Sequence, residues 1–305
     1  MFNQKEYESQ VALLLQCLPS VASESAFAIK GGTAINLFIR DLPRLSVDID
    51  LVYLPISDRS QTLLGIEEGL RRIKEKLAEK DPTLKIMPQM NQATKTIVKL
   101  NILKQETRII IEPNLILRGS VYPSQKMNVV PAVEKRFKVF VSDVLIASIS
   151  DVYAGKICAA LDRQHPRDLF DVKLLLEEGI TTEIKKAFLV YLASNSRPMS
   201  ELLDPYLLDQ RKVYQEEFIG MSNSMVSYET LLEAREALIV TIHKALNDQD
   251  KEFLLSIKRG MPNWDKIDLP HIAQLPGIKW KLLNISRMDP IKHRLALEKL
   301  EKVLA

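Results

Sequence analysis

The sequence predicts an α+β fold in which a mixed region precedes a helical one. Strand-like and helix-like segments alternate over residues 1–140, whereas residues 141–305 keep a helical spacing of apolar residues almost to the end. A chain of 305 residues is long enough for two ordinary domains. We therefore expect an α+β domain over residues 1–140 and a mainly helical domain over residues 141–305. Breaks between the later helices are expected near Gly179, Pro198, Pro262 and Pro270.

The helices and strands of the first domain follow from the spacing of its apolar residues. Helical spacing predicts helices over residues 4–18, 33–41 and 60–80. Short apolar or alternating runs predict strands over residues 26–30, 46–54, 94–103, 107–117 and 137–141.

Several classes of protein are excluded by composition. No apolar run approaches the ~18 residues that span a bilayer, and the N-terminus lacks the basic head and apolar core of a secretory signal. Cys17 and Cys158 lie far apart, which is typical of free thiols in a reducing compartment. The four histidines show no zinc-binding spacing. We expect a cytoplasmic protein with no membrane partner.

The positive charge is concentrated in the C-terminal region. Residues 251–305 contain 11 Lys or Arg against 6 Asp or Glu, a balance of +5, whereas the other 250 residues carry 31 against 33, a balance of −2. Such a region attracts nucleic acid, although a solvated helical surface has the same composition. Its densest cationic group consists of Lys258, Arg259, Lys279, Lys281 and Arg287.

Two carboxylates share one face of the strand expected over residues 46–54. Alternation points Asp48 and Asp50 to the same side, roughly 6–7 Å apart at ~3.3 Å rise per residue. Close anions repel unless a cation lies between them, and Mg²⁺ prefers carboxylate and phosphate oxygens. The pair is therefore a candidate Mg²⁺ site, the alternative being a solvated acidic strand face.

A glycine turn precedes this strand. Gly31 and Gly32 let the backbone approach a ligand closely, and Thr33 begins a helix whose free N–H groups attract phosphate. No Walker-type Gly-Lys-[Ser/Thr] follows, and a plain tight turn is the alternative. With the two aspartates 16 and 18 residues after Gly32, the turn becomes a candidate triphosphate site.

A third carboxylate is available at the end of another strand. Two-metal phosphoryl transfer usually employs three acids. Glu112 closes the run of three isoleucines in "RIIIEPN", and Pro113 ends that strand. Solvation at a sheet edge is the alternative for Glu112.

The second domain adds a lysine and two further acids. Lys156 lies among small and apolar residues of a helix, where it could reach a triphosphate or extend along the helix surface to solvent. Asp168 and Asp171 lie one turn apart on one helix face, next to Arg167. Either acid could be functional, and compensation of the helix dipole is the alternative.

Together these motifs resemble a known family. The segments "KGGTAINLF…RLSVDIDL", "IEPNLILRG" and "AGKICAALDRQHPRDLFDV" are similar in order and spacing to the AbiEii/AbiGii-type nucleotidyltransferase toxins. These are bacterial proteins of abortive-infection and toxin–antitoxin systems. The resemblance implies a nucleotidyltransferase fold like that of DNA polymerase β, with a mixed sheet, flanking helices and a helical C-terminal domain.

The resemblance also implies roles for individual residues. The family's glycine motif falls on Gly31, Gly32 and Thr33, and its acidic strand on Ser46, Asp48 and Asp50. Its third acid falls on Glu112, its helical lysine on Lys156 and its last motif on Arg167, Asp168 and Asp171. Metal ligation is implied for Asp48, Asp50 and Glu112, and phosphate binding for the glycine motif, Ser46 and Lys156.

The implied reaction is transfer of a nucleotide from an NTP, with Mg²⁺ or Mn²⁺, to an acceptor for which RNA such as tRNA is expected. Glu112 or Asp50 could take the proton of the attacking hydroxyl. An antitoxin encoded nearby is the expected partner. A nucleotidyltransferase for proteins or small molecules, or a non-catalytic nucleotide- or RNA-binding protein, remains an alternative. The sequence does not indicate the base of the NTP.

Overall fold

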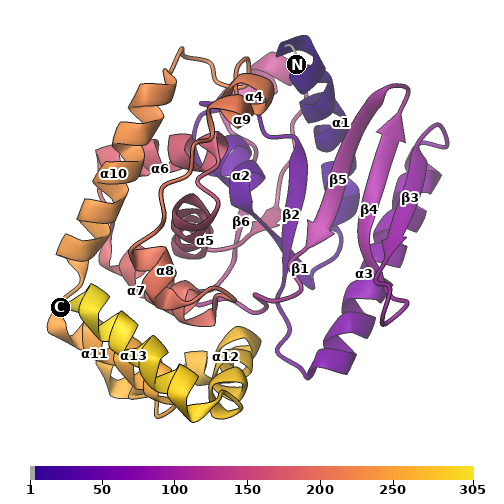
Figure 1. Cartoon of the computed structure of the whole chain (residues 1–305). Coiled ribbons are helices and arrows are strands. Elements are labelled where there is room, and N and C mark those ends of the chain that lie inside the picture. The colour runs from indigo at the N-terminus through magenta and orange to yellow at the C-terminus, as the bar shows by residue number, and fades with distance from the viewer. Residues whose placement is uncertain (1–3) are drawn as a thin grey trace. The chain divides into compact units, whose positions relative to one another are not determined.

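The computed structural model describes residues 4–305, which form two compact units (Figure 1). Unit 1 runs to Val152 and also includes Tyr214–Val226, and unit 2 consists of Tyr153–Val213 and Ser227–Ala305. The first division falls within helix α5 (Ile149–Asp162), later than the boundary expected at residue 140. The α+β fold class is confirmed.

Unit 1 is built on one mixed sheet of 7 strands in the order β3-β4-β5-β2-β1-β7-β6. The pairs β2–β5 and β1–β7 are parallel and the other pairs are antiparallel. The strands are β1 (Phe27–Lys30), β2 (Asp48–Tyr53), β3 (Lys85–Met90), β4 (Ile97–Lys104), β5 (Thr107–Pro113), β6 (Gln125–Met127) and β7 (Val144–Ile146). Helices α1 (Gln4–Ala22) and α3 (Arg59–Lys80) pack against β5 and β4 (Figure 1).

The strand that carries the aspartate pair alternates as expected. Ile49 and Leu51 are fully buried, and Val47 just before the strand is nearly so. Asp48 and Asp50 between them are only half-buried. Burial of one face therefore fixes the register of β2 and turns both aspartates to the other face.

One predicted strand is wrong, and three strands were missed. Residues 137–141 do not form a strand, because Phe137 ends helix α4 (Pro131–Phe137) and Lys138 then takes a left-handed φ of 57°. Proline at the first position and a left-handed residue after the end are common helix boundaries, and they override the strand-like alternation here. Strands β3, β6 and β7 were not predicted: the side chains of β3 are half-buried or exposed, and β6 and β7 have only 3 residues each.

Residues 33–41 were expected to form one helix and instead form two short pieces. Helix α2 (Gly31–Ala34) begins at the first glycine and continues as a π-helical turn, η1 (Ile35–Ile39). Arg40 then returns to extended backbone. The glycine motif is thus the first turn of this helical segment rather than a loop before it.

Unit 2 is helical, as predicted. Its helices are α6 (Pro166–Glu178), α7 (Thr182–Ser194), α8 (Met199–Leu203), α10 (Tyr228–Ala245), α11 (Asp248–Arg259), α12 (Pro276–Ser286) and α13 (Pro290–Leu304), together with most of α5. Helix α6 packs against α10, and α11 packs against α7, α12 and α13 (Figure 1). The division from unit 1 also crosses helix α9 (Arg211–Glu217).

The structure also bears on the two cysteines and on the length and apolar character of the helices. Cys17 and Cys158 are buried free thiols. Among residues 4–305 no helix combines the length and apolar character needed to cross a membrane.

Candidate active site

The first glycine of the turn is packed directly against the aspartate pair. Gly31 follows β1 with a left-handed φ of 67°, and a Cβ at this position would lie 2.5 Å from Oδ2 of Asp50. The register agrees, because Lys30 is the cross-strand partner of Asp50. Both the backbone conformation and the close approach therefore require glycine.

The rest of the glycine motif forms a buried polar network. A Cβ on Gly32 would lie 2.7 Å from a terminal nitrogen of Arg44 and 3.0 Å from Oγ of Ser46. Thr33 Oγ1 is within hydrogen-bond distance of Ser46 Oγ, at 3.1 Å, and also of the backbone carbonyl oxygen of Asp48. This network ties the first turn of α2 to the strand that carries the acids.

The three acids proposed for the metal come from two neighbouring strands. In the parallel pairing of β2 with β5, Asp50 lies opposite Glu112 and Asp48 opposite Ile110. Neighbouring strands are ~4.8 Å apart, and partners in register point to the same face. Asp48, Asp50 and Glu112 therefore share one face of the sheet.

Cations border this acidic face on both sides. Lys99 on β4 makes an ion pair with Glu112, with 2.9 Å between Nζ and Oε2. Lys30 on β1 is the cross-strand partner of Asp50. A row of lysine, aspartate, glutamate and lysine thus runs across β1, β2, β5 and β4. The sequence alone did not indicate Lys99, because its contact with Glu112 depends on the β4–β5 register, in which Lys104 lies opposite Thr107.

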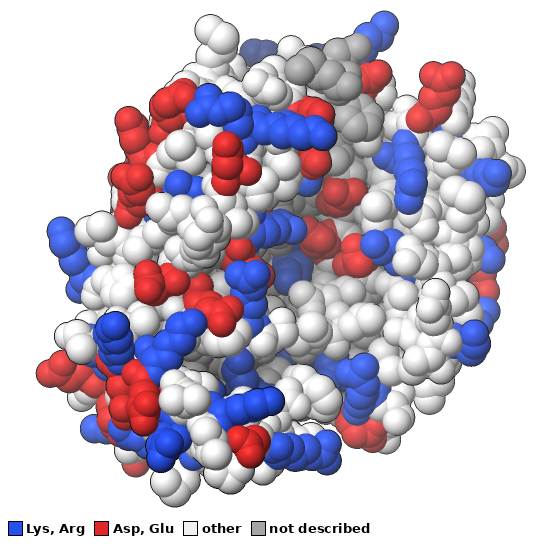
Figure 2. Space-filling model, in the orientation of Figure 1, with Lys and Arg blue, Asp and Glu red and all other residues white. Residues whose placement is uncertain are grey.

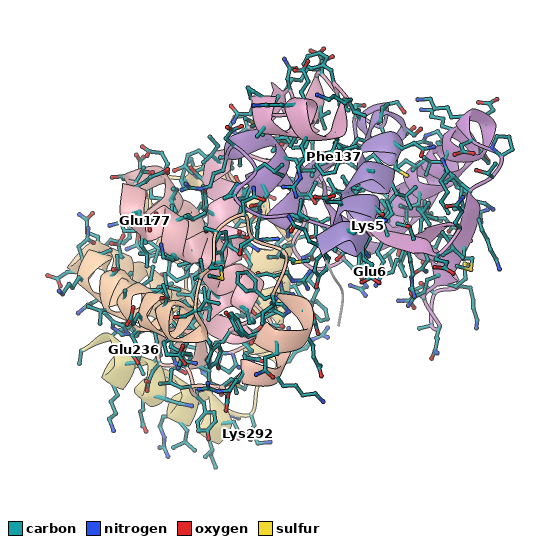
Figure 3. The ribbon with its side chains drawn as sticks, turned by 90° about the horizontal axis from the view of Figure 1, so that it is seen from above. Lys5, Glu6, Phe137, Glu177, Glu236 and Lys292 are labelled. Carbon is teal, nitrogen blue, oxygen red and sulfur yellow. The ribbon has the colours of Figure 1, made fainter. Side chains whose placement is uncertain are left out.

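Two hollows adjoin these acids within unit 1. One, of about 310 Å³, is lined by Lys30, Asp50 and Glu112. The other, of about 670 Å³, is lined by Asp48 together with the N-terminal part of α1, where Lys5 and Glu6 lie (Figure 3). The carboxylates of β2 are therefore accessible to a ligand from unit 1's own surface.

The acids are suitable for Mg²⁺ in donor type but do not form a complete metal cage. Among residues 4–305, no three His, Cys, Asp or Glu side chains gather closely enough to hold a metal ion. Mg²⁺ keeps several waters and is usually held by one or two carboxylates and the substrate's phosphates. The Asp48–Asp50 pair meets that requirement, and Glu112 forms an ion pair with Lys99.

In unit 2, the lysine and both acids of the later motifs form one buried cluster. Lys156 Nζ lies 2.7 Å from Oδ1 of Asp168 and 3.0 Å from Oδ2 of Asp171. The three side chains are 6%, 1% and 0% exposed. Lys156 does not extend along the helix surface to solvent. It holds two carboxylates together inside the unit.

The cluster contains a second cation that the sequence did not reveal. Arg163 Nε lies 2.6 Å from Oδ2 of Asp168, and the Arg163 side chain as a whole is largely exposed. Burial raises the pKa of Asp168, but the charge of Lys156 and the hydrogen bond from Arg163 outweigh it and hold that pKa well below its usual range. Asp168 is therefore ionised at neutral pH. Arg167, the other residue of this motif, lies at the start of α6, where its backbone N–H donates to Nδ1 of His165.

The basic residues of the C-terminal region have varied surroundings. Lys and Arg alternate with Asp and Glu over the surface of these helices (Figure 2). Arg259 pairs with Glu252 at 2.9 Å, and Lys279 donates to Gln274 at 2.7 Å. Lys281 donates to the backbone carbonyl oxygens of Asn195 and Arg197. Binding of RNA by this region stays a prediction.

Gly31→Ala should damage the site more than its backbone conformation alone explains. The added methyl group would collide with the Asp50 carboxylate and displace it. We expect a loss of ~1–3 kcal/mol in the free energy of unfolding from the left-handed backbone and the collision. Nucleotide transfer should fall at least about tenfold, which is ~1.4 kcal/mol in the barrier. Thermal denaturation and a transfer assay measure the two effects.

Gly179→Ala is the matched control. Gly179 also has a left-handed φ, of 90°, but nothing lies within 4 Å of the Cβ position. The substitution should carry the backbone cost without affecting transfer. Equal activity of the two variants would show that the approach of Gly31 to Asp50 has no functional role.

Comparisons with known proteins found one similar family and one similar solved structure. The family model described as "Nucleotidyl transferase AbiEii toxin, Type IV TA system" matches residues 13–274. Among solved structures, the chain is similar to the nucleotidyltransferase toxin MenT4 from Mycobacterium tuberculosis H37Rv, with 13% sequence identity and a TM-score of 0.59. The match covers 92% of this chain and 93% of that one, and at this identity it concerns the fold. No curated protein sequence matches significantly.

Proposed function

This chain belongs to the AbiEii family of nucleotidyltransferase toxins of type IV toxin–antitoxin systems, and we propose that it transfers a nucleotide from an NTP to RNA, such as tRNA, with Mg²⁺ or Mn²⁺. An antitoxin is its proposed partner, and the cytoplasm is its proposed location. The observation that carries the reaction is the register of β2 and β5, which brings Asp48, Asp50 and Glu112 to one face beside the glycine motif.

Asp48 and Asp50 are the proposed holders of the metal ions. Their carboxylates lie two residues apart on one strand face and are accessible from the hollows of unit 1. Bound there, Mg²⁺ would supply Lewis-acid activation of the attacking hydroxyl and charge compensation for the leaving pyrophosphate. The role of Glu112 as a third ligand requires that its pairing with Lys99 be exchanged.

That exchange suggests roles for the flanking lysines. A triphosphate brings several negative charges, which can attract Lys99 away from Glu112 and neutralise the positive charge of Lys30. The released carboxylate of Glu112 could then act as a metal ligand or take the proton of the acceptor hydroxyl, a role for which Asp50 is the other candidate. Lys99 would thus couple the state of Glu112 to the presence of substrate.

In the proposed reaction, a 3′-hydroxyl of the acceptor attacks the α-phosphorus of the NTP. A bond forms between that oxygen and phosphorus, the bond to the bridging oxygen breaks, and pyrophosphate leaves. The backbone of Gly31 and Gly32, with Thr33 and Ser46, would hold phosphates in unit 1. Lys156 of unit 2 is proposed to contribute a cation, and Asp171 or Asp168 to hold that lysine in place.

A transfer assay tests the acceptor and the metal together. The protein is incubated with each of four α-labelled NTPs and total RNA, total protein or small-molecule acceptors. We expect label on RNA, lost in EDTA and restored by excess Mg²⁺, because phosphoryl transfer without the ion loses several kcal/mol of charge stabilisation. Label on protein or small molecules, with none on RNA, would contradict the proposed acceptor, and undiminished transfer in EDTA would contradict the metal.

A further inference from the structure

Unit 2 contains a cavity that lies among helix ends and carries two lysines. It has a volume of about 180 Å³ and is bordered by the C-terminal end of α7, the start of α8, and helices α11, α12 and α13. Lys258 comes from α11, and Lys281 and Trp280 from α12. No Asp or Glu is among the residues that line it. The cavity is therefore cationic with no carboxylate in its wall.

The ammonium group of Lys281 can still donate a hydrogen bond to a ligand. Its ammonium donates to the backbone carbonyl oxygens of Asn195, at 2.5 Å, and Arg197, at 3.2 Å. An ammonium has three protons, so one is left for a ligand. Burial, and next the charge of Lys258, lower the pKa of Lys281 to about 8. The two lysines thus repel one another across a poorly solvated space.

Lys258 differs from Lys281 in that its half-buried ammonium group has no partner among residues 4–305. Among residues 4–305 its side chain makes no hydrogen bond or ion pair, and burial lowers its pKa. Two other cations of this unit are paired, Lys185 with Asp250 at 2.5 Å and Arg259 with Glu252 at 2.9 Å. A half-buried, unpaired ammonium costs free energy, which an anion in the cavity would recover.

The aromatic ring at the cavity indicates what kind of anion is suitable. Trp280 lines the cavity and is 48% exposed, so one part of its ring remains open to a ligand. The volume suffices for a phosphate group and is too small for a whole nucleotide. A base stacked on an exposed aromatic ring contributes ~1–3 kcal/mol. Ile285, Met288 and Leu300 add apolar wall, which strengthens a charge interaction inside.

We propose that this cavity binds the phosphate group of a nucleotide through Lys258 and Lys281 while the base stacks on Trp280. The proposal deepens the proposed binding of an RNA acceptor and rests on it for the source of the nucleotide. A free mononucleotide and a nucleotide within a single strand present the same chemistry. The two sources are distinguished by their affinities.

Trp280 itself reports the binding. The chain has 2 tryptophans, and the other, Trp264, packs against Phe253 with 6.3 Å between ring centroids. In a Trp264→Phe background, the fluorescence of Trp280 is titrated with AMP, adenosine, inorganic phosphate and a single-stranded tetraribonucleotide. We expect saturable quenching by AMP and by the tetranucleotide, tighter for the tetranucleotide if RNA is the source, and weak or no quenching by adenosine.

Lys258→Met should weaken the binding of AMP at least about tenfold, because a charge-assisted hydrogen bond contributes ~1.5–3 kcal/mol. Lys279→Met is the control, since Lys279 is exposed on α12, the helix that carries Lys281 and Trp280, and donates to Gln274 outside the cavity. The affinity of the Lys279→Met variant for AMP should equal that of the parent protein. Trp280→Leu, followed by calorimetry, should weaken AMP more than inorganic phosphate.

Three outcomes would overturn the cavity site. The first is the absence of saturable quenching by AMP or the tetranucleotide, and the second is equal affinity for AMP and adenosine. The third is an equal effect of Lys258→Met and Lys279→Met on the affinity for AMP. The comparison of AMP with adenosine needs no lysine variant and holds even if Lys258→Met fails to fold. The titrations involve no turnover, so Asp48→Asn should leave them unchanged. Binding at Trp280 without transfer onto RNA would overturn the proposed function alone.

Discussion

Asp48→Asn should reduce nucleotide transfer about a thousandfold while the protein stays folded. The substitution keeps the size and polarity of the side chain but removes one negative charge from the proposed metal ligands. Loss of ~4 kcal/mol of transition-state stabilisation corresponds to three factors of ten, at ~1.4 kcal/mol each. Asp48 is half-buried at the start of β2, so we expect little change in melting temperature. Initial rates with labelled NTP and a thermal melt measure both quantities.

Asp143→Asn is the control for this prediction. Asp143 is exposed in unit 1 and has a left-handed φ of 56°, a conformation that asparagine tolerates. The transfer rate of the Asp143→Asn variant should equal that of the wild type.

Glu112→Gln should have a smaller effect on transfer than Asp48→Asn, because Lys99 already neutralises Glu112 at 2.9 Å. A fully active Asp48→Asn variant would exclude the aspartate pair from catalysis.

The acidic face could be predicted because strand alternation is a local property. Val47, Ile49 and Leu51 are apolar, so their burial decides the orientation of Asp48 and Asp50 without knowledge of the neighbouring strands. The approach of Gly31 to Asp50, in contrast, was not predicted, because it depends on the antiparallel pairing of β1 with β2. Whether these residues catalyse the reaction remains a prediction.

The ion pairs could not be predicted, because they depend on which strands and helices become neighbours. Lys99 contacts Glu112 only through the pairing of β4 with β5. Arg163 lies in the turn before α6, and only the fold directs its guanidinium to Asp168. The return of Tyr214–Val226 to unit 1 is also non-local: Leu45 N–H donates to the carbonyl oxygen of Met221 at 2.8 Å.

The second large effect is expected on stability, from Lys156→Met. Lys156 lies within 3.0 Å of both Asp168 and Asp171, all three are at most 6% exposed, and methionine fills a similar volume without the charge. Removing one partner of a buried ion pair costs ~3–5 kcal/mol, because the remaining charges lose their compensation. We expect a loss of this size in the free energy of unfolding, measured by denaturant titration at neutral pH. Any contact of Lys156 with the triphosphate would appear in addition, as a raised KM for the NTP below the melting temperature.

Lys173→Met is the matched control, since Lys173 pairs with Glu177 one turn away on the same helix α6, where Glu177 is exposed (Figure 3). Such surface pairs contribute ~0.3–0.5 kcal/mol.

The effect of pH on stability is a second test. The pKa of Asp168 in the folded state lies below its unfolded value, so this carboxylate stabilises the protein fully above about pH 4 and loses that contribution as pH falls further. The stability difference between wild type and Lys156→Met should therefore be largest at neutral pH and shrink below about pH 4, where the carboxyl groups of the variant become protonated. A difference that is small at neutral pH, or that does not change with pH, would mean that Lys156 does not stabilise the two carboxylates.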